Sequence, residues 1–390
     1  MCKCKYVNEK MRTNDSIILL FVCILTLALC SCHKRQPVAE RERVGTQYAH
    51  FFTLQTRDTT HAGRDFSFTE LTIYNPWEQE RPVLQRYYLC REAATPVPAD
   101  GIRLKVPLER VATGSCTHVG FISALDATEA ICGVTDQHLV YTPLPEKVVN
   151  LGDCISPDAE RFVSVQPDVV FMSAYSTNDA ATTRLAKAGL TVVPVMEWVE
   201  NDPLGRAEWV RFFGAFLGKE TEADSLFAQV ADHYSALCEQ VTASGEAFSR
   251  SILSGGSFRG TWYVPSGSTY MGRLFHDAGA GYAYSQDQTN GSIPLTIEQV
   301  LQHFRDADVW VGAPANTMDE LRQMDGKHTW FKAYQDSCVY TFKARMTPTG
   351  GNDFWEAGVC EPDRILSDLI YVLYPDLLNQ YEPKYLQKLR

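Results

Sequence analysis

Aromatic and arginine side chains follow the ends of several predicted strands. Tyr175 and Trp198 come after two apolar strands in the first half of the chain, and Arg259 lies after a strand in the second half. Ligands of α/β domains bind at the loops that follow the carboxyl ends of strands, so these positions favour ligand contact. The same reasoning adds further residues of the second half, namely Trp262, Tyr263, Arg345 and Trp355.

These side-chain types indicate one kind of ligand. Aromatic faces suit a large flat or aromatic molecule, and guanidinium groups suit carboxylate or catecholate groups on it. Each aromatic residue taken alone could equally belong to the core. His118, in the segment Ser115–His118 after another strand, and His138 are candidate iron ligands, although a single histidine is more often structural or solvated. The sequence holds no His-rich run of the kind expected for a carrier of bare zinc or manganese.

Common catalytic motifs are absent from the sequence. It contains no His-Glu-x-x-His, no Gly-x-Ser-x-Gly and no phosphate-binding P-loop. Gly279-Ala280-Gly281 is followed by Tyr284, where a dinucleotide-binding fingerprint needs glycine or alanine. We therefore expect a protein that is not an enzyme. A chelatase-like metal-handling enzyme is the less favoured alternative, supported only by analogy of fold.

Two glutamates occupy matching places in the two halves of the chain. Glu160 ends the segment 155–160, which leads into a predicted helix and then an apolar strand that opens with Asp168. Glu298 ends the segment 293–298, which leads into a helix and a strand in the same way. The similarity of these two segments predicts two related βα units. Either glutamate could simply favour a helix N-terminus, where a carboxylate interacts well with the helix dipole.

The start of the chain is typical of an export signal. Basic residues precede an apolar run from Ile17 to Leu29, which is too short to cross a bilayer as a helix. The run ends in Leu29-Cys30-Ser31-Cys32, which resembles a bacterial lipobox. We expect cleavage before Cys32, attachment of lipid to its sulfur, and a periplasmic protein anchored to a bacterial membrane. An ordinary signal peptide is the alternative, and Met11 could replace Met1 as the true start.

Composition and charge restrict the partners. The 390 residues are 45% hydrophobic and 21% charged, which is typical of a globular chain. The 47 acidic residues outnumber the 36 lysines and arginines, and this balance argues against nucleic acid as a partner. Export permits disulfides, but their pairing is left open and buried free cysteine is the default. The cysteines that follow Cys32 are Cys90, Cys116, Cys132, Cys154, Cys238, Cys338 and Cys360.

Hydrophobic patterning predicts the elements that position these residues. Residues 48–105 contain strand-like runs and predict a small antiparallel β portion. Further on, short continuous apolar strands alternate with helices, as in buried parallel sheets. The predicted strands are 148–151, 168–172, 190–195, 251–254, 261–264, 308–312 and 338–342. The predicted helices are 117–127, 157–165, 178–188, 206–217, 220–243, 270–278, 296–304 and 362–373.

The predicted fold class is α/β, with two Rossmann-like lobes of parallel sheets, a long connecting helix and a small N-terminal β portion. The predicted organisation is a signal peptide at 1–31, a tether at 32–45, an N-terminal lobe with a β-rich start at 46–201, linking helices at 202–244 and a C-terminal lobe at 245–390.

Several short motifs carry a family resemblance. In the first half they are Pro107-x-x-Arg110-Val111, Leu151-Gly152, residues 157–160, residues 166–170 and residues 189–193. In the second half they are residues 277–279, 295–300 and 307–310. Their order and spacing over residues 106–375 resemble the helical-backbone (class III) solute-binding proteins of ABC importers, the group for ferric siderophores, haem and cobalamin. Residues 48–105 and extra aromatic residues in the second half depart from simpler members, which leaves the cargo open.

The resemblance implies a role for the features described above. It implies a shallow cleft between the lobes, with closure limited by the linking helix. It also implies that Glu160 and Glu298 dock onto basic residues of a membrane permease. We therefore expect a monomeric lipoprotein, without a cofactor or metal of its own, that carries an iron complex (a ferric siderophore or haem) to an ABC importer. Cobalamin is the alternative cargo.

Overall fold

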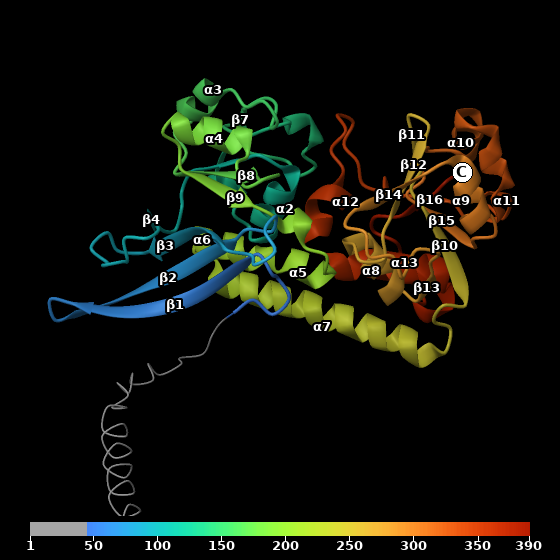
Figure 1. Cartoon of the computed structure of the whole chain (residues 1–390), viewed down its shortest axis with the longest axis horizontal. Helices are drawn as coiled ribbons and strands as arrows, with labels where there is room; N and C mark the ends of the chain where they lie inside the picture. The colour runs from blue at the N-terminus through green and yellow to red at the C-terminus, as the bar shows by residue number, and fades with distance from the viewer. Residues whose placement is uncertain (1–44) are drawn as a thin grey trace, which may run out of the picture. The chain divides into compact units, whose positions relative to one another are not determined.

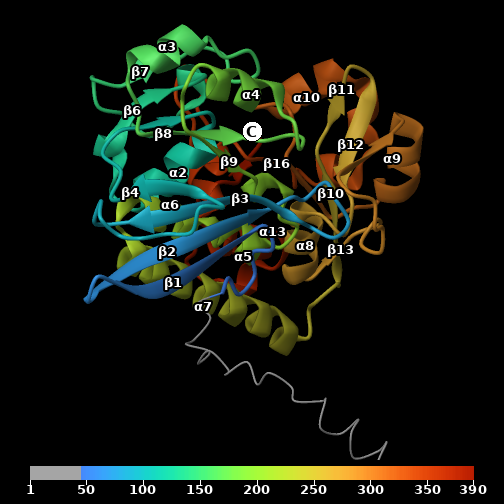
Figure 2. The same cartoon turned by 60° about the vertical axis from the view of Figure 1, so that its left-hand side comes forward.

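A four-stranded sheet precedes the two lobes. The computed structural model describes residues 45–390, so the signal peptide, Cys32 and all but the last residue of the predicted tether lie outside the described residues. The sheet has the order β1-β2-β3-β4, and Figures 1 and 2 show β1, β2 and β3 side by side. Its strands are β1 (Phe52–His61), β2 (Arg64–Tyr74), β3 (Val83–Cys90) and β4 (Ile102–Lys105).

The edge of this sheet differs from the sequence prediction. The pairs β1–β2 and β2–β3 are antiparallel as expected, but β4 lies parallel to β3. A parallel neighbour needs a long connection in place of a tight turn. Residues 91–101, which include Pro96 and Pro98, supply that connection. The β portion is therefore not purely antiparallel.

Lobe one, the part of the chain from β5 to β9, contains a five-stranded sheet. Its strand order is β7-β6-β5-β8-β9, and every pair is parallel. Its strands are β5 (Val111–Thr113), β6 (Ile131–Val134), β7 (Val149–Asn150), β8 (Val169–Ser173) and β9 (Val192–Val195). Its helices are α2 (Cys116–Ala124), α3 (Ala159–Ser164) and α4 (Ala180–Lys187). The strands β5, β6 and β8 are buried along their whole length. For β8 this confirms the buried parallel strand expected from its continuous apolar run, whereas β5 and β6 are not among the strands predicted above.

The linking region consists of three helices. They are α5 (Pro203–Ala207), α6 (Trp209–Leu217) and α7 (Glu220–Ser244). The single helix predicted over 206–217 is thus two helices, and the first begins earlier because Asp202 caps it. Gly218 and Gly245 end α6 and α7 with positive φ angles of 66° and 74°. Helix α7 packs against α6 of this region and α13 (Pro362–Leu373) of lobe two, and Figure 1 shows it passing both lobes.

Lobe two, from β10 onward, contains a parallel sheet, a three-stranded antiparallel sheet and the antiparallel pair of β16 and β17. The parallel sheet has the order β13-β10-β15 and the antiparallel sheet has the order β11-β12-β14. Its strands are β10 (Arg250–Ser254), β11 (Ser257–Phe258), β12 (Thr261–Pro265), β13 (Ala280–Gly281), β14 (Ser292–Leu295), β15 (Val309–Val311), β16 (Tyr340–Thr341) and β17 (Gln387–Lys388). Besides α13, its helices are α8 (Tyr270–Asp277), α9 (Ile297–Phe304), α10 (Met318–Met324), α11 (Lys332–Gln335) and α12 (Asp353–Glu356).

One hydrophobic core joins the lobes and the linking helices. The aromatic side chains of α6 pack on both the N-terminal sheet and lobe one: the ring centroids of Phe212 and Phe52 are 5.6 Å apart, and those of Phe213 and Phe171 are 4.9 Å apart. On the other side, the Tyr234 hydroxyl of α7 donates to Asp277 of α8 at 2.8 Å. The same buried cluster continues into lobe two. The α/β class with two lobes and a long connecting helix is confirmed.

Candidate functional site

An exposed pair of rings stands at the ends of two neighbouring parallel strands. Tyr175 follows β8 and Trp198 follows β9, and their ring centroids are 5.3 Å apart. The indole N–H of Trp198 donates to the carbonyl of Ala174 at 3.2 Å, which fixes the ring against the end of β8. Tyr175 is 59% exposed and Trp198 is 40% exposed. The two residues therefore form an exposed aromatic surface.

Beside this pair, the N-terminus of α2 carries buried polar groups. Glu197 is buried and accepts a hydrogen bond of 2.7 Å from the Thr117 hydroxyl. Burial, with Glu356 and Glu197 nearby, raises the pKa of the Cys116 thiol to about 11. Burial also lowers the pKa of His118 to about 4, although Glu197 acts in the opposite direction. A thiol of this kind is inert, and the candidate iron ligand His118 is a neutral interior side chain with no exposed surface.

A second group of candidates lies where the lobes meet. Arg345 is paired with Asp353 at 2.6 Å, and its guanidinium carbon lies 5.1 Å from the centre of the Tyr141 ring of lobe one. The buried Glu356 accepts the backbone N–H groups of Tyr141 and Thr142 at 2.6 and 2.8 Å. Beside it, Trp355 is exposed. Arg345 and Trp355 therefore stand at the junction of the lobes.

Backbone contacts make this junction close. A Cβ atom added to Gly120 of α2 would lie 2.2 Å from the carbonyl oxygen of Glu356. A Cβ atom added to Gly351 would lie 2.3 Å from the carbonyl oxygen of Val140. Both distances are far below van der Waals contact, so only glycine fits at these two positions without a shift. The two lobes touch backbone to backbone at this point.

The remaining candidates are on a hairpin of lobe two. Arg259 and Gly260 form the two-residue loop between β11 and β12, with φ angles of 52° and 84° that are typical of a tight hairpin turn. The Arg259 guanidinium carbon lies 5.1 Å from the centre of the Phe258 ring. Phe258 is 63% exposed, and sequence reasoning missed it because its strand has only two residues. Its position directly before Arg259 was the available signal.

Trp262 and Tyr263 point in opposite directions on β12. Tyr263 is 45% exposed, whereas Trp262 is 1% exposed and donates its indole N–H to the carbonyl of Ser254 at 2.9 Å. Alternate residues of a strand face opposite sides, so both cannot line one surface. Trp262 is a core residue, which is the alternative that the sequence left open.

The two candidate docking glutamates occupy the same place on two helices. Glu160 is the second residue of α3 and Glu298 is the second residue of α9, and both side chains are exposed. Asp158 caps α3, while Thr296 and Gln299 form a reciprocal cap on α9. Glu298 also contacts the Lys327 ammonium at 2.8 Å, and this partner lowers the pKa of Glu298.

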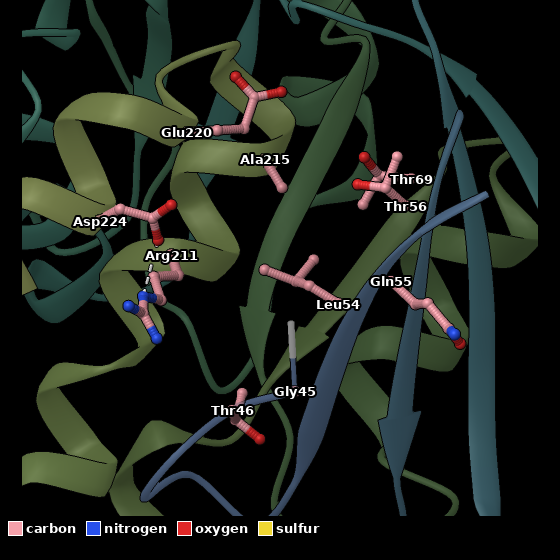
Figure 3. A pocket seen from close by; sticks show the side chains of 10 residues that line it. All are labelled: Gly45, Thr46, Leu54, Gln55, Thr56, Thr69, Arg211, Ala215, Glu220 and Asp224. Carbon is pink, nitrogen blue, oxygen red and sulfur yellow. Dashed lines mark ion pairs between the residues drawn. The ribbon is translucent and has the colours of Figure 1, made fainter. Parts of the chain in front are cut away.

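A cavity of about 170 Å³ separates β1 and β2 from α6 and α7 (Figure 3). Its polar wall is already paired, because the Arg211 guanidinium contacts Asp224 at 2.8 Å and Glu208 at 2.8 Å. We assign no ligand to it. Within residues 45–390, all seven cysteines are free, and no group of three or more His, Cys, Asp or Glu side chains is arranged to hold a metal ion. None of the helices in this range is long and apolar enough to span a membrane.

Comparison with known families identifies the class of protein to which this chain belongs. Residues 111–346 match the family described as periplasmic binding protein. The chain belongs to the periplasmic binding protein family. As a member it is an extracytoplasmic solute-binding protein and not an enzyme, as the sequence predicted.

This periplasmic binding protein is similar in sequence to an uncharacterized lipoprotein, and it shares its fold with proteins named for haem and siderophore binding. It is 26% identical to an uncharacterized lipoprotein of Methanocaldococcus jannaschii over 74% of this chain and 72% of the relative. A periplasmic heme-binding protein of Pseudomonas aeruginosa has the same fold, with a TM-score of 0.55, 16% identity, and coverage of 73% of this chain and 98% of that one. A siderophore-binding protein of Vibrio cholerae, solved with Fe³⁺-Desferal, gives a TM-score of 0.51, 14% identity, and coverage of 68% and 99%.

Proposed function

We propose that this periplasmic binding protein captures an iron complex, either a ferric siderophore or haem, and delivers it to an ABC importer. The observation that carries the proposal is the exposed Tyr175–Trp198 ring pair at the ends of β8 and β9. A fixed aromatic surface suits the flat or aromatic groups of such complexes. The named ligands of the Pseudomonas and Vibrio proteins, which share this fold, belong to the same chemical class.

The proposed binding surface combines three groups of residues. The ring pair forms the first group, Arg345 and Trp355 at the lobe junction form the second, and Arg259 and Tyr263 of the β11–β12 hairpin form the third. We add Phe258 to the hairpin group because its exposed ring lies beside Arg259. The arginines would pair with carboxylate or catecholate oxygens of the cargo. Trp262 is left out because its indole is in the core.

The test is a titration of the purified full-length protein in detergent with haem, ferric desferrioxamine and cobalamin, followed by tryptophan fluorescence. We expect haem or the ferric siderophore to quench the fluorescence. The substitution Trp198→Ala should weaken that binding by about tenfold or more, because it removes half of the ring pair. Trp330→Ala is the matched control, because Trp330 is an exposed tryptophan on the 3₁₀ turn Gly326–Trp330 and is not among the residues of the proposed surface. Unchanged affinity in Trp198→Ala, or binding of cobalamin alone, would contradict the proposal.

We also propose that Glu160 and Glu298 dock onto basic residues of the permease. Their matching positions on α3 and α9 support a paired role, since each lobe then contributes one exposed carboxylate. Lys327 already holds Glu298, so it would compete with a permease cation for the same oxygen.

The docking proposal is tested by the ATPase activity of the importer reconstituted with this protein. The double substitution Glu160→Lys with Glu298→Lys should abolish stimulation, and Lys327→Met should lower the protein concentration needed for half-maximal stimulation because it frees Glu298. The double substitution Glu222→Lys with Glu239→Lys, which reverses two exposed glutamates of α7, is the control for net charge. Full stimulation by the double variant would refute docking through these residues while leaving cargo binding untouched.

The mature N-terminus is part of the proposal. We propose that the mature chain begins at Cys32, carries lipid on that cysteine, and reaches its first lobe through the tether 32–45, with lobes at 46–201 and 245–390 and linking helices at 202–244. The lipoprotein relative supports the anchor. Cys32→Ser should move the protein from the membrane fraction to the soluble periplasmic fraction. Continued membrane attachment of that variant would show another mode of anchoring.

A further inference from the structure

A cavity of about 360 Å³ lies where the N-terminal sheet packs against the edge of lobe one. Its walls come from β3, β4, the loop after β8, helix α4 and strand β9. In Figure 1 these elements lie on the side of lobe one away from lobe two. The cavity is therefore separate from the lobe junction, where Arg345 and Trp355 stand.

The N-terminal sheet creates this cavity. Strand β9 is the edge strand of the lobe-one sheet, and an uncovered edge strand would be open to pairing with another chain. The Tyr87 hydroxyl of β3 donates to the carbonyl of Val192 of β9 at 3.1 Å. The side-chain amide of Asn75 donates to the Thr177 hydroxyl at 3.1 Å. These contacts hold the sheet over the edge strand and leave a space between them.

Hydroxyl groups dominate the polar lining of the cavity. No lysine, arginine or histidine is among the described residues that line it, so a phosphate or carboxylate would find no counter-charge there. One amide, from Gln85, and one carboxylate, from Asp179, accompany the hydroxyls, and aliphatic side chains complete the walls. The hydroxyl-bearing residues are Tyr87, Ser176, Thr177, Thr182, Thr183 and Thr191.

Thr182 supplies an unused hydrogen-bonding group. Its hydroxyl oxygen is buried and has no hydrogen-bond partner among the described residues. Its backbone N–H is already used, because it donates to an Asp179 carboxylate oxygen at 2.9 Å in the cap of α4. A buried hydroxyl without a partner costs stability, and rotation of the Thr182 side chain toward the cavity would let a ligand hydroxyl remove that cost.

We infer that this cavity binds a small neutral polyhydroxylated molecule, such as a monosaccharide or a cyclic sugar alcohol. Hydroxyl groups of the ligand can both donate to and accept from the threonine, serine, amide and carboxylate groups of the wall, and its C–H faces can pack on the aliphatic residues. The volume falls within the range of about 300–1,000 Å³ typical of small-molecule sites. This second site adjoins the ring pair of the proposed iron-complex surface, because Ala174 and Ser176, which line the cavity, flank Tyr175.

The test is isothermal titration calorimetry on the full-length protein in a detergent without a sugar headgroup. The probes are glucose, myo-inositol and, as the anionic comparison, glucose 6-phosphate. We expect one of the two neutral probes to bind and the phosphate to bind at least about tenfold more weakly. Ala186→Leu fills the cavity from α4 and should abolish binding, whereas Ala188→Leu places the same side chain on a residue that does not line the cavity and should bind as the wild type does.

A second substitution tests the hydrogen bond to the ligand without changing the volume of the cavity. Thr182→Val keeps the shape of the side chain but removes the hydroxyl, and it should weaken binding by about tenfold. Circular dichroism and haem titration of every variant show whether the fold and the proposed cargo surface are intact. The inference is overturned if neither neutral probe binds at about 10 mM, if Ala186→Leu binds like the wild type, or if the phosphate binds more tightly than glucose.

Discussion

Single buried carboxylates fix the segments at both ends of the described chain. Glu208 accepts the backbone N–H groups of Gln47, Tyr48 and Ala49 at 2.8–3.0 Å, in addition to its pairing with Arg211. Asp368 of α13 likewise accepts the N–H groups of residues 384–386 near the C-terminus. A buried carboxylate needs several donors to remain stable, and each of these has them. These two buried carboxylates are therefore structural.

His118 gives the stability of the protein a defined pH dependence. Its pKa is about 4 in the folded protein and near 6.5 in an unfolded chain, so between these values only the unfolded chain binds the proton. The contribution of His118 to the free energy of unfolding is therefore complete above pH 6.5. It falls by about 3 kcal/mol in all as the pH decreases to 4. Urea unfolding at several pH values should show His118→Gln losing less stability than the wild type over that interval.

Comparing the pH dependence of stability in the wild type with that in His118→Gln isolates the contribution of His118. Burial raises the pKa of Glu356, so Glu356 acts in the opposite direction, but it does so in both proteins. His61→Gln, a change at an exposed position, should follow the wild type. If the wild type and His118→Gln lose the same amount of stability over this pH interval, His118 is protonated in the folded state.

Helix α2 is the element on which the site depends. Its first turn contacts Glu197 through Thr117, next to the ring pair, and its middle contacts α12 of lobe two through Gly120. On a third side, Phe121 stacks on Phe213 of α6 with ring centroids 5.0 Å apart. One short helix thus connects the aromatic surface, the lobe junction and the linking helices.

Gly120→Ala tests the closeness of the lobes at α2. Alanine favours a helix over glycine by about 1 kcal/mol, yet its Cβ would lie 2.2 Å from the Glu356 carbonyl. We expect a net destabilisation of about 1–3 kcal/mol in chemical unfolding, since the backbones must separate. Gly326→Ala is the control, because no atom lies within 4 Å of its added Cβ. A Gly120→Ala variant as stable as the wild type would show that the junction opens freely.

At the scale of the whole molecule, the linking helices behave as part of the core and not as a flexible connector. A single cluster of buried side chains includes residues of the N-terminal sheet, lobe one, α6, α7 and lobe two. The Tyr234–Asp277 contact and the contact of His233 with Asp363 at 2.7 Å attach α7 to two helices of lobe two. This arrangement restrains large movements of one lobe against the other.

A continuous core predicts cooperative unfolding. Differential scanning calorimetry of the full-length protein should show one transition for both lobes, with calorimetric and van't Hoff enthalpies that agree. Fluorescence of the tryptophans, which lie in both lobes, should follow the same curve. Two separated transitions would show that the lobes unfold independently and that the linking helices do not couple them.

Local patterns in the sequence were sufficient to predict many helices and strands of this protein. The predicted helix 362–373 has the bounds of α13, and the apolar strand at 168–172 corresponds to β8 within one residue at each end. The matching positions of Glu160 and Glu298 on their helices also follow from nearby residues. Such features depend on hydrophobic periodicity and capping, which act over a few residues.

Contacts between residues far apart in the sequence decided the features that local patterns did not predict. Whether Trp262 or Tyr263 faces the core depends on Trp310, which packs on Trp262 with ring centroids 5.3 Å apart. The parallel placement of β4 and the division of the predicted helix 206–217 likewise depend on partners elsewhere in the chain. The sequence by itself determined the class of the protein and many of its elements. Only the tertiary structure decided which side chains are exposed and where the cavity at β9 lies, because burial is set by neighbours that are far away in the sequence.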